Sequence, residues 1–310
     1  MQAIRVHRFG DLDVLVLDDV PRPVPGEGEV LLRVKAAGVG PWDALIRSGH
    51  SVLPQPLPLT LGSDVSGVVE EVGAGIAQFQ VGDAVFGATN DRFTGGYAEY
   101  AVATASKLAK MPRRLGFIEA ASVPVVACTA WQMVFEYGGV DQTKRVLVHG
   151  AAGNVGAYAL QLAKRVAPEV IATVRSGGVE HAHALGADRV IDVQASRFEE
   201  VVADVDVVLD TIGGDTLERS FGVLKPGGAL ISAVAEPDQE KAARHGVRAR
   251  FFLVDVSTHR LEELATLIEA GALTTNTGEV LPLAEARIAH EMLAGRSHKR
   301  GKIVLRTDRA

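Results

Sequence analysis

A glycine-rich turn between a strand-like and a helix-like segment constrains the fold of this chain most. The apolar run Val146–His149 ends at Gly150, and residues 150–156 read G-A-A-G-N-V-G. Apolar residues at helical spacing follow at once, namely Val155, Ala159, Leu162, Ala163 and Val166. In a strand, turn and helix of this order, unpaired backbone N–H groups and the positive end of the helix dipole converge on the turn. The segment therefore predicts a dinucleotide-binding turn.

Individual residues of the turn have distinct expected roles. Gly153 lets the backbone approach a pyrophosphate, and Gly156 lets the helix pack closely on the strand. Ala151 stands where the usual G-x-G-x-x-G pattern has its first glycine, with Gly150 one residue earlier. The alternative is a glycine-rich turn that only saves space. The residues of this turn that we expect to bind the cofactor are Gly150, Ala151, Ala152, Gly153, Asn154, Val155 and Gly156.

Alternating strand and helix patterns surround the turn. They predict a doubly wound parallel sheet within residues 122–269. After the strand at 146–149, the expected strands are 170–174, 190–191, 205–209, 229–234 and, as a sixth, 251–254. We expect the amphipathic helix Leu261–Glu269 to close this domain.

The remaining sequence reads as a β-rich domain in two pieces. Residues 1–121 carry short alternating strands between turns rich in glycine and proline, which is typical of a barrel-like β domain. The strand-like segment Gly301–Leu305 has no partner in a finished six-stranded sheet. We therefore expect residues 1–121 and 270–310 to form one discontinuous domain.

Composition excludes several kinds of partner. The formal charge of -6 gives no basic surface for nucleic acid or an anionic membrane. No apolar run reaches the roughly 18 residues that a membrane span needs, and residues 1–5 read as a strand and not as a signal peptide. The single cysteine, Cys128, excludes an internal disulfide and a cysteine-rich zinc site. We predict a cytoplasmic protein.

Several segments together resemble one protein family. They are L-G-S-D-V-S-G-V-V (61–69), V-G-D-A-V-F-G (81–87), G-G-Y-A-E-Y (95–100), H-G-A-A-G-N-V-G-A-Y-A-L-Q-L-A-K (149–164), L-G-A-D-R-V-I-D (185–192) and G-K-I-V-L (301–305). These segments are similar to the medium-chain dehydrogenase/reductase superfamily and, within it, to the zinc-independent quinone oxidoreductase branch. The resemblance implies an α/β protein, with a Rossmann domain and a discontinuous β-rich GroES-like catalytic domain. It also implies hydride transfer from NADPH to a quinone, enone or related carbonyl acceptor.

The zinc-ligand segments of the superfamily are altered in this chain. The zinc alcohol dehydrogenases carry cysteine and histidine in a G-x-C-H-x-D segment and a second histidine in a G-H-E segment. The matching residues here are Gly40, Pro41 and Asp43, followed by Gly62 and Ser63. Glycine, proline and serine cannot supply the nitrogen and sulfur ligands of a stable zinc site. We expect no metal.

The residue after the second strand of the nucleotide domain indicates the cofactor. NAD-preferring sites place an acid about 20 residues past the glycines, where it binds the ribose 2′-hydroxyl. Arg175 stands at that place, followed by Ser176. A guanidinium and a hydroxyl suit a 2′-phosphate, so NADPH is favoured. The alternative is a solvated surface arginine.

The resemblance implies further cofactor contacts. Thr129 would lie near the cofactor phosphate or nicotinamide, and Lys302 would reach the cofactor from the returning chain. Residues at the ends of later strands would supply the rim and flank the ring, namely Thr211, Ile212, Gly213, Ser232, Ala233, Phe252, Leu253 and Val254. Each of these taken alone is as easily a core or surface residue.

The catalytic groups are the least determined part of the site. Related quinone reductases often carry asparagine and tyrosine in an N-P-x-x-x-Y-x-R segment, but here the segment is Gly40–Arg47 and both are missing. The candidates are Asp43, Ser63 and Trp42, whose ring offers a stacking surface for a flat substrate. Asp43 could equally be a structural carboxylate that pairs with Arg47.

Two other functions and an assembly state remain to be weighed. The chain could be an NADPH-binding sensor or structural protein without turnover, or an enoyl reductase of one biosynthetic pathway. The resemblance implies that the apolar run Arg250–Val256 forms the outermost strand of the sheet, and its open edge together with the resemblance to dimeric relatives favours a homodimer. The alternative is that helix Leu261–Glu269 covers this edge.

Overall fold

The computed structural model describes residues 1–307, which fold into two compact units. The first unit consists of Met1–Val125 and the chain from Asp255 onward, and the second is Val126–Val254. The domain boundaries expected from the sequence were 121/122 and 269/270. The second boundary lies earlier in the structure, at 254/255, because α8 (Thr258–Glu269) packs against β8 (Leu108–Lys110) of the first unit. The assignment of folding domains stays a prediction.

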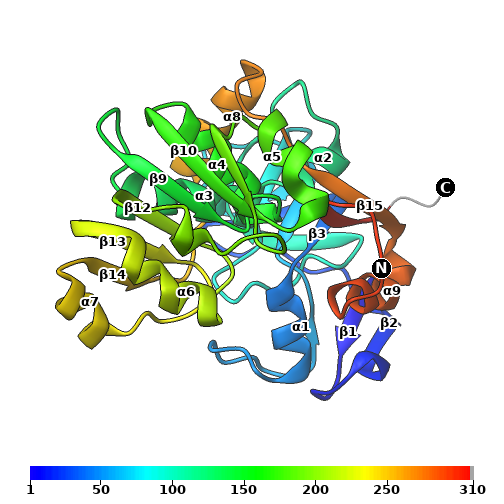
Figure 1. Cartoon of the computed structure of the whole chain (residues 1–310). Coiled ribbons are helices and arrows are strands. Elements are labelled where there is room, and N and C mark those ends of the chain that lie inside the picture. Colours follow the sequence, from blue (N-terminus) through cyan, green and yellow to red (C-terminus); the bar gives the residue numbers. More distant parts are fainter. Residues whose placement is uncertain (308–310) are drawn as a thin grey trace. The chain divides into compact units, whose positions relative to one another are not determined.

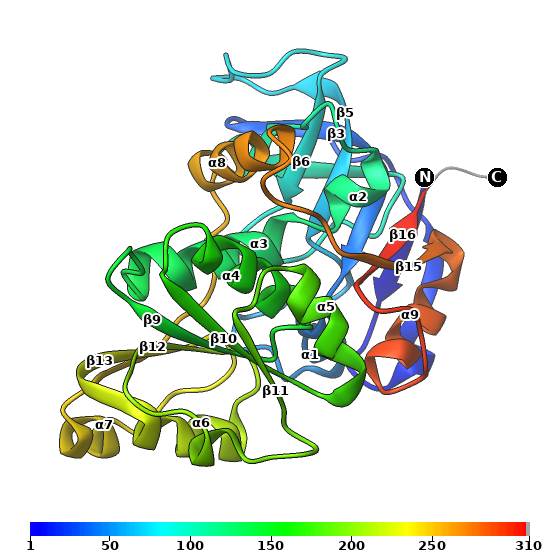
Figure 2. The same cartoon turned by 45° about the horizontal axis from the view of Figure 1, so that its top comes forward.

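The second unit contains the expected doubly wound sheet, seen nearly edge-on in Figure 2. Its strand order is β11-β10-β9-β12-β13-β14, and every neighbouring pair is parallel. Helices α4 and α5 cover one face of the sheet, and α6 and α7 cover the other. The strands are β9 (Arg145–His149), β10 (Glu169–Val174), β11 (Arg189–Asp192), β12 (Val205–Asp210), β13 (Leu224–Ser232) and β14 (Arg248–Phe251). The helices are α3 (Pro124–Trp131, begun in the first unit), α4 (Asn154–Lys164), α5 (Val179–Ala184), α6 (Gly214–Ser220) and α7 (Gln239–His245).

Two strand boundaries differ from the expected ones. The sixth strand, β14, ends at Phe251, so the expected strand at 251–254 was placed about three residues too late. β13 begins at Leu224, five residues before the expected strand at 229–234, and runs through Pro226–Gly228, whose composition is typical of a turn. The register with β12 shifts between Val205 and Val207, so an irregular pairing accommodates this segment.

The first unit is β-rich, as expected, and is built on two sheets (Figure 1). A seven-stranded sheet has the order β15-β16-β3-β5-β6-β8, with β7 also paired to β3, and a second sheet has the order β2-β1-β4. The last strand, β16, pairs antiparallel with β3, which confirms that the end of the chain returns to this unit. The strands are β1 (Gln2–Val6), β2 (Leu15–Asp19), β3 (Glu29–Val39), β4 (Leu59–Thr60), β5 (Asp64–Val72), β6 (Ala84–Ala88), β7 (Tyr100–Thr104), β8, β15 (Thr277–Pro282) and β16 (Lys302–Arg306). Its other helices are α1 (Pro41–Ser48), α2 (Phe117–Ala121) and α9 (Ala286–Leu293).

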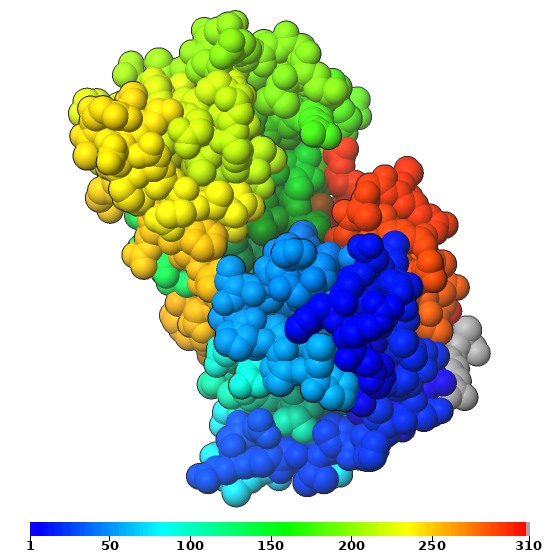
Figure 3. All heavy atoms as spheres, turned by 90° about the horizontal axis from the view of Figure 1, so that it is seen from below, coloured from blue at the N-terminus to red at the C-terminus, as the bar shows by residue number. Residues whose placement is uncertain are grey.

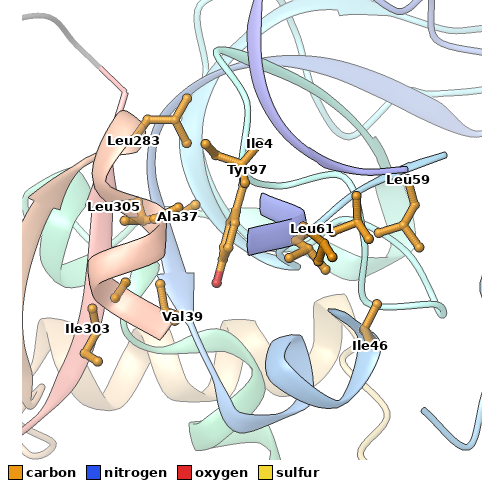
Figure 4. Close-up of a cluster of buried hydrophobic side chains, with 14 of the residues drawn as sticks. Ile4, Ala37, Val39, Ile46, Leu59, Leu61, Tyr97, Leu283, Ile303 and Leu305 are labelled. Atoms are coloured by element: carbon orange, nitrogen blue, oxygen red, sulfur yellow. The ribbon is translucent and has the colours of Figure 1, made fainter. Parts of the chain in front are cut away.

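An aromatic side chain lies at the centre of one core of the first unit. Tyr97 is fully buried among aliphatic side chains from β1, β3, β16 and the segments around α1 and α9 (Figure 4). A Cβ atom on Gly62 would lie 2.0 Å from the Tyr97 ring, so this glycine makes room for it. The N-terminal strands and the segment of α9 lie beside each other at the surface of this unit (Figure 3). Within residues 1–307, no helix is both long and apolar enough to cross a membrane.

Candidate functional site

The glycine-rich turn joins β9 to α4 through a tightly packed backbone. Gly150 has a φ of 70°, a conformation that favours glycine, and its carbonyl accepts a hydrogen bond from the Gly153 N–H at 2.8 Å. A Cβ atom on Gly156 would lie 2.2 Å from the Gly150 oxygen, so only glycine allows this close approach of helix and turn. The N-cap residue of α4, Gly153, supplies no side-chain hydrogen bond to the first turn of the helix. The turn therefore presents backbone N–H groups and the positive end of an 11-residue helix, as an anion-binding turn requires.

The ends of β12 and β13 lie at the same edge of the sheet as this turn. Asp210 is aligned with His149 on β9 and with Ser232 on β13. Its buried carboxylate accepts hydrogen bonds from the Ile212 and Gly213 backbone, each at 3.0 Å, and from the Ser232 hydroxyl at 2.8 Å. The Thr211 hydroxyl donates to the His149 carbonyl at 2.7 Å. The structure thus brings the glycine turn together with four expected rim residues, and the Asp210 carboxylate fixes their loop.

The two residues that follow β10 differ in their side-chain contacts. Arg175 is exposed, and its guanidinium forms no hydrogen bond or ion pair with residues 1–307. The Ser176 hydroxyl lies 2.5 Å from the Asp192 carboxylate and 3.0 Å from the Gln194 side-chain oxygen. Arg175 is therefore available to a phosphate, whereas Ser176 already has protein partners. Asp192, at the end of β11, was not anticipated as a neighbour of this site.

The other expected contacts of the second unit lie in different environments. Thr129 is buried on α3. The Phe252 ring packs on the Tyr137 ring with centroids 4.7 Å apart, so Phe252 is a core residue here. Leu253 is exposed, and Val254 is partly exposed. Whether these residues touch the cofactor stays a prediction.

In the first unit, Asp43 is paired differently from the alternative suggested by the sequence. Its Oδ2 atom accepts hydrogen bonds from the Gly40 N–H and from the Tyr97 hydroxyl, both at 2.8 Å. Arg47 instead donates to the Gly10 carbonyl at 3.3 Å and contacts His290 Nδ1 at 3.1 Å. The expected alternative of an Asp43–Arg47 salt bridge is wrong, because the two side chains leave α1 toward different partners. Burial raises the pKa of Asp43 to about 7.

Trp42, Ser63 and Lys302 form a second group in the same unit. The Trp42 indole N–H donates to the Ser63 hydroxyl at 3.3 Å, and the Lys302 ammonium lies 4.2 Å from the centre of the Trp42 ring. The same ammonium pairs with Asp64 at 2.7 Å, and both side chains are fully buried. Lys302 was expected to reach the cofactor, but its charge is already paired within the first unit. Its partners Asp64 and Trp42 occupy segments that the sequence had singled out, L-G-S-D and Gly40–Arg47.

Two comparisons of sequence place this chain in a family. Residues 26–113 match the alcohol dehydrogenase GroES-like domain, and residues 185–305 match the family described as zinc-binding dehydrogenase. The quinone oxidoreductase of Lama guanicoe is 33% identical, over 98% of this chain and 97% of that protein. The quinone oxidoreductase of Homo sapiens is 30% identical over the same shares. This chain belongs to the quinone oxidoreductase branch of the medium-chain dehydrogenase/reductase superfamily.

Solved structures of this superfamily have the same fold over the whole chain. The quinone oxidoreductase from Coxiella burnetii has a TM-score of 0.92 at 33% identity and covers 99% of both chains. A mycobacterial protein solved in complex with NADPH has a TM-score of 0.88 at 32% identity, over 99% of this chain and 100% of that one. A cobalt- and zinc-bound alcohol dehydrogenase from Pyrobaculum aerophilum has a TM-score of 0.86 at 32% identity, over 99% of each chain. Superfamily members with this fold therefore include a metal-bound protein, and the fold alone does not decide metal use.

Proposed function

We propose that this NAD(P)H-dependent oxidoreductase transfers hydride from NADPH to a quinone, enone or related carbonyl acceptor without zinc. The proposal depends on the N-terminus of α4 beside the Gly150–Gly156 turn, where the N-cap residue provides no side-chain hydrogen bond. A Cβ atom on Gly156 would collide with the Gly150 carbonyl there. This turn fits a dinucleotide pyrophosphate, and the bound nicotinamide would supply the hydride. The protein's task is then to hold the cofactor, orient the acceptor and exclude water.

NADPH is the proposed form of the cofactor because of Arg175. Its exposed guanidinium has no protein partner within residues 1–307 and can form a two-pronged contact with a 2′-phosphate. The Asp192 carboxylate, held by Ser176, has the opposite effect on a phosphate. The preference for NADPH therefore depends on the arginine outweighing a nearby acid.

Zinc independence is proposed from the chemistry of the altered segments. Pro41 and Ser63 stand where zinc enzymes of the superfamily carry soft or nitrogen ligands, and the Ser63 hydroxyl contacts Trp42. Among residues 1–307, no three His, Cys, Asp or Glu side chains lie close enough to hold a metal ion. Activity should survive chelator treatment, and elemental analysis should find far less than one zinc per chain. Stoichiometric zinc with chelator-sensitive turnover would refute this assignment.

The acceptor is proposed to be a flat conjugated molecule that stacks on Trp42. The ring is contacted by the Lys302 ammonium and also packs on Gly40 and on the core around Tyr97, so a substrate would stack on the part of the ring that stays exposed. We further propose a cytoplasmic location and a homodimer formed through β14.

Oxidation of NADPH with a panel of quinones and enones tests the function. We expect turnover with quinones, lower rates with simple enones, and slower turnover of the best quinone when Trp42 is replaced by alanine. The loss of both polar groups from the Gly40–Arg47 segment favours a second candidate, an NADPH-binding sensor. NADPH binding by calorimetry without turnover on the whole panel would favour the sensor, and turnover confined to enones would favour the pathway-specific enoyl reductase.

A further inference from the structure

The two oxygens of the Asp43 carboxyl lie in different environments. The side chain is fully buried, and both of its hydrogen-bond donors, Gly40 N–H and the Tyr97 hydroxyl, point at Oδ2. Oδ1 is buried and has no hydrogen-bond partner among residues 1–307. Because Oδ2 already accepts two hydrogen bonds, a proton on this carboxyl sits on Oδ1. The structure therefore builds one particular form of a neutral acid, with its O–H available to an oxygen acceptor.

The groups around Asp43 come from several elements of the first unit. Burial is the largest influence and raises its pKa to about 7, whereas Gly40, Lys302 and Tyr97 lower the pKa. Lys302 on β16 forms an ion pair with Asp64 on β5. The negative charge of Asp64 raises the pKa of Asp43 and is the smallest of these influences. On α9, burial lowers the pKa of His290 to about 3, so His290 is neutral and accepts from Arg47 through Nδ1. Burial also raises the pKa of Tyr97 well above its usual value, which keeps its hydroxyl a donor (Figure 4). The raised pKa of Asp43 lets this carboxyl exchange a proton near neutral pH.

We propose that Asp43 holds the proton that must accompany each hydride, and this rests on the proposed reduction of a quinone. A quinone that accepts a hydride becomes a hydroquinone monoanion, which needs one proton to become neutral hydroquinone. The O–H bond at Asp43 Oδ1 breaks, an O–H bond forms on the acceptor oxygen, and the Asp43 carboxylate then takes a proton from solvent. The oxidised nicotinamide and the hydroquinone balance the two electrons.

Asp43 acts in this proposal as a relay residue. Its side chain has no exposed surface and Oδ1 has no partner among residues 1–307, so the proposal requires that the acceptor oxygen, or a water molecule that bridges to it, hydrogen-bonds to Oδ1 during turnover. The helix position supports this role, because Asp43 follows Trp42, the proposed stacking residue, at the start of α1. The relay predicts that turnover falls as the pH rises above about 7, the pKa of the carboxyl.

The substitution Asp43→Asn reproduces the neutral acid without its transferable proton. The amide oxygen can accept from Gly40 and Tyr97, and the amide nitrogen takes the place of Oδ1. We expect kcat with 1,4-benzoquinone to fall about 100-fold, the usual scale of general acid catalysis, and the decline above pH 7 to disappear. Affinity for NADPH and the melting temperature should stay close to those of the wild type.

The substitution Tyr97→Phe tests whether Asp43 transfers a proton, because it should change the pH at which kcat declines. A carboxyl with a purely structural role would leave that pH unchanged. The substitution removes a hydrogen bond that lowers the pKa of Asp43, so the decline in kcat should shift to higher pH. Infrared titration of the cofactor-free protein provides a measurement independent of activity. A protonated-carboxyl band that disappears as the pH rises through about 7, and is missing in Asp43→Asn, is the expected result.

The outcomes separate this proposal from the proposed function. If the wild type reduces quinones but Asp43→Asn keeps kcat within twofold, the relay is wrong and the quinone reductase assignment stands. A Tyr97→Phe variant with an unshifted decline, or no Asp43 band in the infrared, also overturns the relay. If the wild type reduces no quinone, the proposed function fails and the relay fails with it.

Discussion

At the scale of single residues, cofactor choice depends on Arg175. Replacing it with alanine should narrow the preference for NADPH over NADH by roughly 1–3 kcal/mol, the scale of a hydrogen bond to a charged group. Isothermal calorimetry with both cofactors measures this difference. Arg244→Ala, which removes another exposed arginine of the second unit, is the matched control and should leave the preference unchanged. Equal affinities for NADPH and NADH in the unmutated protein would contradict the prediction.

A buried histidine in the second unit makes stability depend on pH. The Ser220 hydroxyl donates to the Thr216 carbonyl at 2.7 Å, so His149 Nε2 must donate to Ser220, at 3.0 Å. His149 Nδ1 then accepts from the Thr173 hydroxyl at 2.9 Å, and the ring is neutral. Burial lowers its pKa to about 3. This arrangement satisfies a core histidine and does not activate Ser220 as a nucleophile, because the serine proton is directed to a carbonyl.

The sign of this pH effect follows from the lowered pKa. Between pH 6.5 and about 3 the unfolded chain binds a proton at His149 that the folded chain does not bind. The free energy of unfolding therefore decreases as the pH is lowered through this window. The loss is at most about 1.4 kcal/mol per pH unit, and His149→Gln should remove it from the profile measured by urea unfolding. The raised pKa of Asp43 acts in the opposite direction, so the variant and wild type are compared at each pH. His50→Gln, at an exposed position, is the control; identical slopes for wild type and His149→Gln would contradict the prediction.

At the scale of elements, the turn between β9 and α4 depends on Gly156. A Cβ atom there would lie 2.2 Å from the Gly150 oxygen, so Gly156→Ala must push the helix away from the turn. We expect an overpacking loss of about 1–3 kcal/mol in stability and at least a tenfold loss of NADPH affinity. Gly222→Ala is the matched control, because no atom lies within 4 Å of the Cβ it would add. Unchanged NADPH affinity in Gly156→Ala would show that this turn does not bind the cofactor.

The same elements show what the sequence could and could not predict. Local signals were sufficient for β9, α4 and the parallel, doubly wound class of the sheet, because a glycine at a positive φ and β-branched runs have strong local causes. They failed at β13, where Pro226–Gly228 has the composition of a turn but lies within the strand. The pairing of Leu224 with Val205 on β12 decided its start, and such long-range pairing is invisible in a short window.

The first unit's polar groups were the least predictable part. Asp43 and Arg47 stand four residues apart on α1, a spacing that favours a salt bridge on a helix. Tyr97 and His290, distant in sequence, capture the two side chains instead. The G-G-Y-A-E-Y motif contains Tyr97, but nothing in it points to Asp43, so only the fold could reveal the pair.

At the scale of the whole molecule, we predict a homodimer formed through β14. This strand pairs with β13 on one side and is the last strand of its sheet, so its other edge has no strand partner within residues 1–307 and can pair with a second copy. Phe252 is already buried against Tyr137, so the residues left to be covered are Phe251, which is partly exposed, and the exposed Leu253. The helix considered as an alternative cover, α8, packs against β8.

Light scattering at micromolar concentration tests this assembly directly. We expect a mass near twice the 32.7 kDa of one chain. A proline in place of Arg250, in the middle of β14, removes a backbone donor and should shift the mass toward that of one chain. Proline in place of Val24, an exposed residue in an irregular segment between Pro23 and Pro25, is the control and should leave the mass unchanged. If the unmutated protein has the mass of one chain, the edge of β14 is protected in some other way, and the dimer is wrong.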